Sequence, residues 1–130
     1  MLSGSIHTSP TPSFIANAAL ATKYAAVKSH TVVNEVVVAT ATTDETIGFT
    51  QEEQATAGHA VPVKVEGYTL ANAGSGGWTR GDKLTPAADG ELITTTTAAN
   101  KVCAIAEDTV SDNETGEVKI ISPAVRYDSF

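Results

Sequence analysis

The pattern of hydrophobic and polar positions predicts short β-strands along most of the chain. Alternation is clearest over residues 60–66, where three valines share one side of the predicted strand and its polar residues share the other. Residues 31–42 instead carry mostly β-branched apolar residues at both parities, which is typical of a strand buried on both faces or covered by a partner. Residues 43–59 are polar and acidic, and they predict a loop with one short strand around Ile47 and Phe49.

The apolar positions change parity after Gly67, where Tyr68 and Leu70 continue the strand pattern. A strand tolerates such a change only with an inserted residue, so we predict a β-bulge at residues 66–67 and a bend of the chain there. Residues 72–77 contain three glycines and a serine, and they predict an exposed loop.

Four further strands are expected at residues 83–85, 91–96, 102–107 and 117–122, each bounded by turn-forming residues. Short strands separated by glycine turns, at a spacing of roughly 10 residues, predict an all-β fold. We expect a small barrel or sandwich of short antiparallel strands.

The N-terminal segment has a different pattern. Residues 1–12 contain Pro10 and Pro12 without hydrophobic periodicity, and they predict an extended arm. Over residues 13–28 the apolar residues follow a near-helical spacing that Ser13 would cap, although the segment is equally consistent with an arm that orders against a neighbour. We therefore divide the chain into an arm at 1–30, with or without a short helix, and a β domain at 31–130.

A chain of 130 residues has the length of a single domain. Nineteen Thr and thirteen Val against five Leu favour strands, and the three Phe, three Tyr and one Trp predict a thin core. The net charge of −7 disfavours binding to nucleic acid, because few cations are available to neutralise phosphates. No apolar run is long enough to span a membrane and no targeting signal is recognisable, so we expect synthesis in the cytosol.

Residues with catalytic or metal-binding chemistry are few and scattered. The three histidines lie outside any nucleophile motif, so we predict no enzyme activity, no cofactor and no metal site. Asp108, Asp112 and Glu114 predict a solvated turn in preference to a calcium loop. Cys103, the only cysteine, cannot form an intrachain disulfide and is expected to be a small buried residue. Trp78 is expected either to anchor an interface or to close the end of a barrel.

Several turn-and-strand segments carry a resemblance to a known family. Gly81-Asp82-Lys83-Leu84 is followed by Asp89-Gly90-Glu91-Leu92-Ile93, and later by Ala104-Ile105-Ala106-Glu107-Asp108 and Gly116-Glu117-Val118-Lys119-Ile120. In this order, over about residues 45–122, the chain resembles the capsid decoration, or cement, proteins of tailed bacteriophages. Cys103-Ala104 departs from the family pattern, which often has an apolar residue followed by Gly at this point.

The resemblance implies a structural protein on the outer surface of the assembled head. Such a protein would staple neighbouring subunits of the major capsid protein, commonly as a homotrimer, and would stabilise the shell against the pressure of packed DNA. The arm is suited to strand addition on the capsid, and the strand at 32–39 is the candidate protomer contact. The candidate interaction residues are Pro10, Pro12, Phe14, Ile15, Val33, Val37 and Trp78.

Two other functions remain open at this stage. The first is a carbohydrate-binding or adhesive module of a phage fibre or cell surface, in which Trp78 and Tyr68 form a stacking platform. The second is a biotinyl- or lipoyl-like carrier domain, because the turn at residues 81–84 is similar to a turn in those small β-sandwiches. The modified-lysine motif of such carriers is absent.

Overall fold

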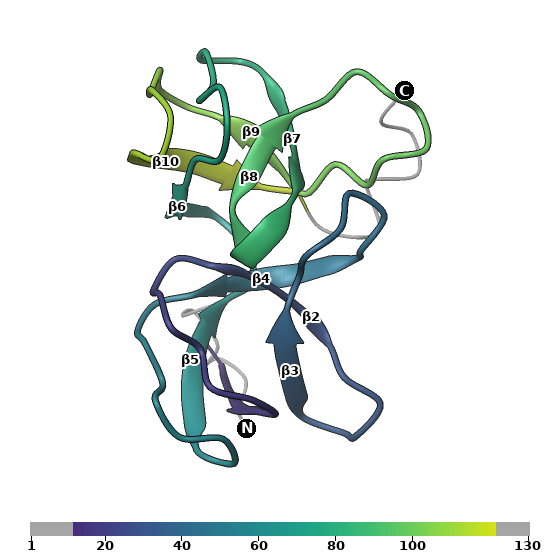
Figure 1. Cartoon of the computed structure of the whole chain (residues 1–130), viewed down its shortest axis with the longest axis vertical. Coiled ribbons are helices and arrows are strands. Elements are labelled where there is room, and N and C mark those ends of the chain that lie inside the picture. The colour runs from purple at the N-terminus through teal and green to yellow at the C-terminus, as the bar shows by residue number, and fades with distance from the viewer. Residues whose placement is uncertain (1–11, 122–130) are drawn as a thin grey trace, which may run out of the picture.

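Two lobes are stacked along the long axis of the molecule (Figure 1). Both are built from strands, which confirms the all-β fold expected from the strand pattern, although that pattern predicted a single barrel or sandwich. The computed structural model describes residues 12–121. The N-terminal lobe is a closed barrel of β1 (Ser13–Ala16), β2 (Ala26–Ser29), β3 (Glu35–Val38), β4 (Thr46–Thr50) and β5 (Ala60–Lys64). The second lobe is a sheet of β6 (Tyr68–Asn72), β7 (Lys83–Pro86), β8 (Leu92–Thr94), β9 (Ala104–Ala106) and β10 (Thr115–Ile120), with a 3₁₀ turn at Ala88–Gly90.

The barrel is closed by its first strand. β1 pairs in parallel with β3, where Ile15 lies opposite Glu35, and antiparallel with β5, where Phe14 lies opposite Val61. The helix predicted within residues 13–28 is therefore wrong, and this stretch supplies β1 and β2 to the barrel. Its near-helical spacing came from alanines, which suit either structure. Of the alanines in that spacing, Ala25 is buried, whereas Ala18 and Ala21 are exposed, so the spacing does not mark a buried helical face.

The strand expected at residues 31–42 is much shorter than predicted. Only Glu35–Val38 forms β3, and the preceding residues form the exposed turn of the β2–β3 hairpin, where Asn34 has a φ of 67°. Val36 is fully buried, whereas Val33 is 84% exposed. The prediction that both faces of the whole segment are covered is therefore wrong within this chain.

The second lobe follows the predicted strands closely. Its sheet has the order β6-β10-β9-β7-β8, and the strands expected at 83–85, 91–96, 102–107 and 117–122 appear as β7, β8, β9 and β10 with shifted ends. A parallel bridge between Ala73 and Leu92 links the chain just after β6 to β8. None of the described residues forms a helix long and apolar enough to cross a membrane.

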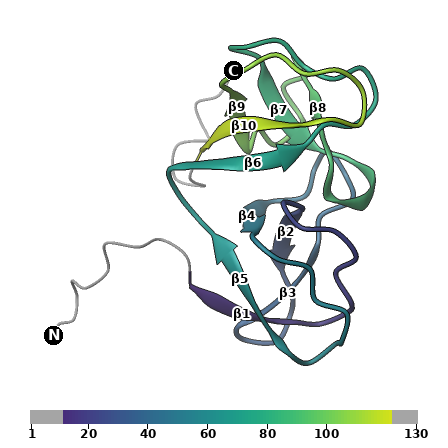
Figure 2. The ribbon, with the colours of Figure 1, turned by 90° about the vertical axis from the view of Figure 1, so that its left-hand side faces the viewer.

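The predicted bulge at residues 66–67 is wrong, because the inward parity does not change. Thr69 and Ala71 are the buried residues of β6, in phase with the buried Val61 and Val63 of β5. The chain does bend here: at Gly67, with a φ of 87°, it leaves the barrel and enters the second sheet (Figure 2).

The two lobes share part of their hydrophobic core. One cluster of small aliphatic residues fills the barrel, including Val27, Val36 and Val63. A second cluster fills the other lobe and also contains Ala26, Ala39 and Phe49 from the barrel strands and their ends. Phe49 therefore joins the barrel to the core of the second lobe.

Candidate docking surfaces

The barrel brings together most of the predicted interaction residues. The Pro12 carbonyl accepts a hydrogen bond from the Val63 N–H at 3.0 Å, which holds the start of β1 against β5. Phe14 packs against the barrel core. Ile15 and Val37 are half-buried, and Val37 lies opposite Lys28. Four of the predicted residues are thus placed on the neighbouring strands β1 and β3 or at their ends.

The tip of the β2–β3 hairpin carries the most exposed large hydrophobic side chain of the described residues. Val32 is 51% exposed and Val33 is 84% exposed. The turn is held by hydrogen bonds from the Glu35 N–H to the Val32 carbonyl at 3.1 Å and from the His30 N–H to the Glu35 carbonyl at 2.9 Å. We call Val32 and Val33 the apolar tip. Because the backbone of this turn is already fixed, a partner that binds these side chains loses little affinity to the ordering of the loop.

Two predicted residues do not belong to this group. Pro10 lies outside the described residues. Trp78 is in the second lobe and only 3% exposed, and its backbone pairs with Val110. A Cβ on Gly116 would approach the Trp78 ring to 3.2 Å, so the ring is tightly covered. Trp78 therefore belongs to the core of the second lobe, and the stacking platform suggested for Trp78 and Tyr68 does not form.

Sequence reasoning missed an exposed pair on β6. Tyr68 is 50% exposed and Leu70 is 41% exposed, and they lie opposite Lys119 and Glu117 of β10. β6 is an edge strand. The available signal was the parity of the valines in β5, which, continued through residue 67, places Thr69 inward and this pair outward.

The β6 edge also presents backbone groups. The Gly67 carbonyl accepts the Ile120 N–H at 2.8 Å, and the Ala73 N–H donates to the Glu114 carbonyl at 2.7 Å. In an antiparallel pair such residues alternate along the strand, so the odd-numbered residues of β6 bond to β10. The backbone N–H and C=O groups of Tyr68 and Leu70 consequently point away from β10.

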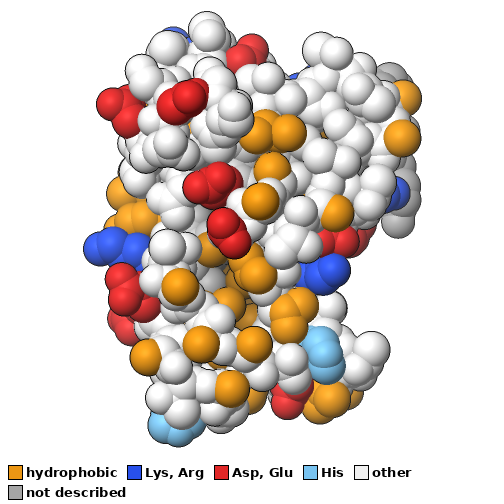
Figure 3. All heavy atoms as spheres, in the orientation of Figure 1, with side chains coloured by type: hydrophobic (Ala, Val, Ile, Leu, Met, Phe, Trp, Pro, Cys, Tyr) orange, Lys and Arg blue, Asp and Glu red, His pale blue; other side chains and the backbone are white. Residues whose placement is uncertain are grey.

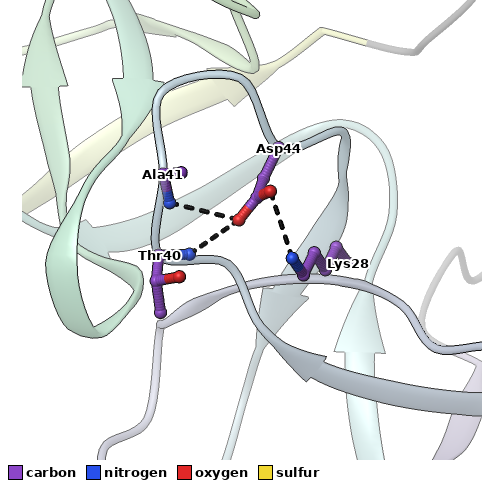
Figure 4. Close-up of polar contacts among 4 residues, drawn as sticks. All are labelled: Lys28, Thr40, Ala41 and Asp44. Carbon is purple, nitrogen blue, oxygen red and sulfur yellow. Dashed lines mark hydrogen bonds and ion pairs between the residues drawn. The ribbon is translucent and has the colours of Figure 1, made fainter.

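Asp44 organises the loop between β3 and β4 (Figure 4). Its Oδ2 accepts hydrogen bonds from the Thr40 N–H at 2.9 Å and the Ala41 N–H at 3.1 Å, and its Oδ1 lies 3.1 Å from Lys28 Nζ. Partial burial acts to raise the pKa of the Asp44 carboxyl, but the Thr40 N–H, Lys28 and the Ala41 N–H together hold it below its ordinary value. Asp44, with its ion pair to Lys28 and its two backbone hydrogen bonds, therefore fixes the loop that follows β3.

Other carboxylates have the same role in the second lobe. Asp82 accepts the Thr79 N–H at 2.9 Å, Glu114 accepts the Ser111 N–H at 2.9 Å, and Asp108 accepts the Glu117 N–H at 3.2 Å. Asp112 accepts the Gly76 N–H. Across residues 12–121, no three His, Cys, Asp or Glu side chains are grouped so that they could hold a metal ion. Acidic residues here are used to fix turns.

Lys83 and Cys103 lie within or beside the second sheet. Lys83 is the first residue of β7 and lies opposite Ile105, so it is not at the tip of a hairpin as the lysine of a carrier domain would be. This position of Lys83 argues against a modified-lysine carrier and favours a binding surface. Cys103 is fully buried, as expected for a small hydrophobic residue.

Comparison with known proteins identifies the family. The phage cement protein family matches residues 16–120, which span nine of the ten described strands and the end of β1. The chain belongs to the phage cement protein family. No curated protein matches the chain.

A solved structure has the fold of this cement-family chain. The crystal structure of the N base of head fiber gp8.5 in bacteriophage phi29 is similar with a TM-score of 0.65 at 18% identity. The similarity covers 85% of this chain and 92% of that chain, so it includes both lobes. Family and fold together make this a structural protein associated with the phage capsid.

Proposed function

We propose that the protein binds the outer surface of the assembled head and staples neighbouring subunits of the major capsid protein. The apolar tip carries this proposal, because Val32 and Val33 are held out from the barrel with no cover from the described chain. Contiguous apolar surface that a monomer leaves exposed often marks a contact site, and here two adjacent valines are exposed on a hairpin turn whose backbone is held by hydrogen bonds.

Two lobes arranged end to end suit a stapling role. The apolar tip lies on the hairpin of the barrel, and the exposed pair Tyr68 and Leu70 lies on the other lobe. A protein with separate contact points engages its second site at high effective concentration once the first is bound. Modest individual contacts are then sufficient to bridge two subunits and to stabilise the shell against the pressure of packed DNA.

Self-association is the second part of the proposal. A homotrimer would place three copies of each contact point on one shell position, and the half-buried side chain of Val37 on β3 is the proposed protomer contact. Val37→Asp should shift the protein toward monomers in light scattering coupled to gel filtration, because transferring a carboxylate from water into a protomer contact is costly. A variant that stays fully assembled contradicts this contact.

Binding to the shell is tested with purified undecorated heads. The wild-type protein should sediment with the heads, and Val33→Asp should reduce the bound fraction strongly, because the charge is added at the most exposed point of the apolar tip. Ala98→Asp is the matched control, since it adds the same charge at an exposed position of the other lobe. Absence of wild-type binding, or equal losses for both variants, contradicts the proposed contact.

A further inference from the structure

A groove of about 700 Å³ runs between the two lobes. The linker at residues 19–25, between β1 and β2, lines it on the barrel side, and the end of β6 and residues 89–91 line it on the other. Its volume is within the range of roughly 300–1,000 Å³ that is usual for ligand clefts. Figure 3 shows hydrophobic side chains along the middle of this face, with acidic side chains beside them.

The walls of the groove are fixed to one another. Asn72 Nδ2 donates to the Lys23 carbonyl at 2.9 Å, and Thr115 Oγ1 donates to Asn72 Oδ1 at 3.0 Å. Gly90 fits so closely that a Cβ there would lie 2.9 Å from the Ala25 Cβ. The groove is therefore formed in the isolated chain and does not have to open for a ligand.

Charge is distributed unevenly in the groove. Glu53, Asp89 and Glu91 contribute three carboxylates, against the single ammonium group of Lys23, which lies 5.3 Å from the centre of the Tyr24 ring. None of the three carboxylates takes part in an ion pair between residues of the 12–121 range. These carboxylates differ from those that cap turns elsewhere, and they leave negative charge available to a cationic partner.

The linker also offers backbone donors. Within residues 12–121, the N–H groups of Ala21, Thr22 and Lys23 make no hydrogen bond to the chain. The small exposed side chains of Ala19 and Ala21 let another main chain approach this part of the linker closely, and main-chain hydrogen bonds give affinity to an extended peptide. An apolar floor, free N–H groups and a negative charge excess together favour a peptide over a small neutral ligand.

We propose that the interlobe groove binds an extended segment of the capsid shell that carries Lys or Arg beside small apolar residues. This inference rests on the proposed function, because it names the part of the shell that the protein grips. It adds a contact with the shell beside the apolar tip and the exposed pair Tyr68 and Leu70, and it does not depend on self-association. Excess negative charge in the groove would select the segment and would make docking sensitive to salt.

The charge requirement is tested with full-length protein and purified undecorated heads. The triple variant Glu53→Gln, Asp89→Asn and Glu91→Gln should bind heads at least about tenfold more weakly, with a smaller dependence on salt than the wild type. Asn is chosen at residue 89 because Asp89 has a φ of 60°, which Asn also tolerates. The control Glu52→Gln, Glu66→Gln and Glu107→Gln removes three carboxylates that do not line the groove, and its affinity should stay within about twofold.

The segment itself is identified by crosslinking. Ala21→Cys places a thiol on an exposed groove residue. A thiol-reactive benzophenone will label only this cysteine, because the native Cys103 is fully buried. Illumination on purified heads should crosslink a capsid peptide that contains Lys or Arg. Crosslinking to another copy of this chain, or to a capsid segment without basic residues, overturns the inference.

The outcomes separate the two proposals. If the wild type binds heads and the groove triple variant, shown to be folded by its thermal unfolding, binds equally well, the groove inference fails and the proposed function stands. If the wild type does not bind heads at all, the proposed function fails as well.

Discussion

The two lobes reach similar all-β structures by different means. The barrel contains a parallel strand pair, between β1 and β3, and its interior is filled by Leu, Val and Ala with Phe14 and Ile47 at its margin. The second lobe contains the larger buried residues Trp78, Leu84 and Leu92, and it also receives Phe49 from the barrel. The barrel therefore shares part of its buried apolar surface with its neighbour, and we expect its stability to depend on this shared core.

Phe49→Ala is the strongest test of this dependence. Phe49 is fully buried, so its truncation should reduce the free energy of unfolding by about 3–5 kcal/mol in chemical denaturation. Val27→Ala, fully buried inside the barrel, is the control and should cost only about 2 kcal/mol. Equal losses would show that the barrel core is as important as the shared core.

Gly90→Ala probes the contact between the lobes. The new Cβ would lie 2.8 Å from Val38 Cγ2 and 2.9 Å from the Ala25 Cβ, at a φ of 74°, so we expect a loss of about 2–4 kcal/mol. Gly58 has a φ of 88° but nothing within 4 Å of its added Cβ, and Gly58→Ala should cost only the backbone strain, about 1 kcal/mol. If the two variants unfold at the same temperature, the close packing of the lobes at Gly90 is contradicted.

Asp44→Asn tests the barrel's own polar support. The variant loses the charge that strengthens the hydrogen bonds donated by the Thr40 and Ala41 N–H groups. Its free energy of unfolding at neutral pH should therefore be lower by about 1–2 kcal/mol. The folded pKa lies below the ordinary 3.8, so the carboxylate stabilises the fold above that pH, and this stabilisation is lost as the pH falls through the folded pKa. Wild-type stability should therefore fall more steeply than that of the variant below about pH 4. If the stabilities of the wild type and the variant fall in parallel as the pH is lowered, the stabilising role of the Asp44 carboxylate is contradicted.

Val33→Asp should have the smallest effect on stability. Its side chain is 84% exposed and outside the core, so the free energy of unfolding should change by no more than about 0.5 kcal/mol. A thermal melt checks this directly. A large destabilisation would show that the apolar tip has a structural role in the barrel, and it would weaken the case that the tip is reserved for docking.

The same contrast explains how far the sequence allowed prediction. The strands of the second lobe are bounded by glycine turns and carboxylate caps that act over a few residues, such as Asp82 on Thr79, so local patterns locate them. The barrel strand β1 is defined by pairing with β3 and β5, which are distant in sequence, and alanine spacing alone suggested a helix there. Non-local pairing overrode local propensity.

The candidate surfaces show a similar division. As apolar residues of the predicted arm and of one predicted strand, Ile15, Val33 and Val37 are candidate contacts, and the structure places them on adjacent elements of the barrel. Residue type alone points to Trp78 as a contact, but its side chain is buried. The groove could not be foreseen, because residues 19–25 and 89–91 meet only when the two lobes pack together.

Decoration of the shell is tested most directly by the temperature at which purified undecorated heads are disrupted. Saturating wild-type protein should raise that temperature, Val33→Asp should raise it less at the same concentration, and Ala98→Asp should match the wild type. If heads carrying bound wild-type protein are disrupted at the same temperature as bare heads, the protein attaches to the shell without stapling it, and the central claim is contradicted.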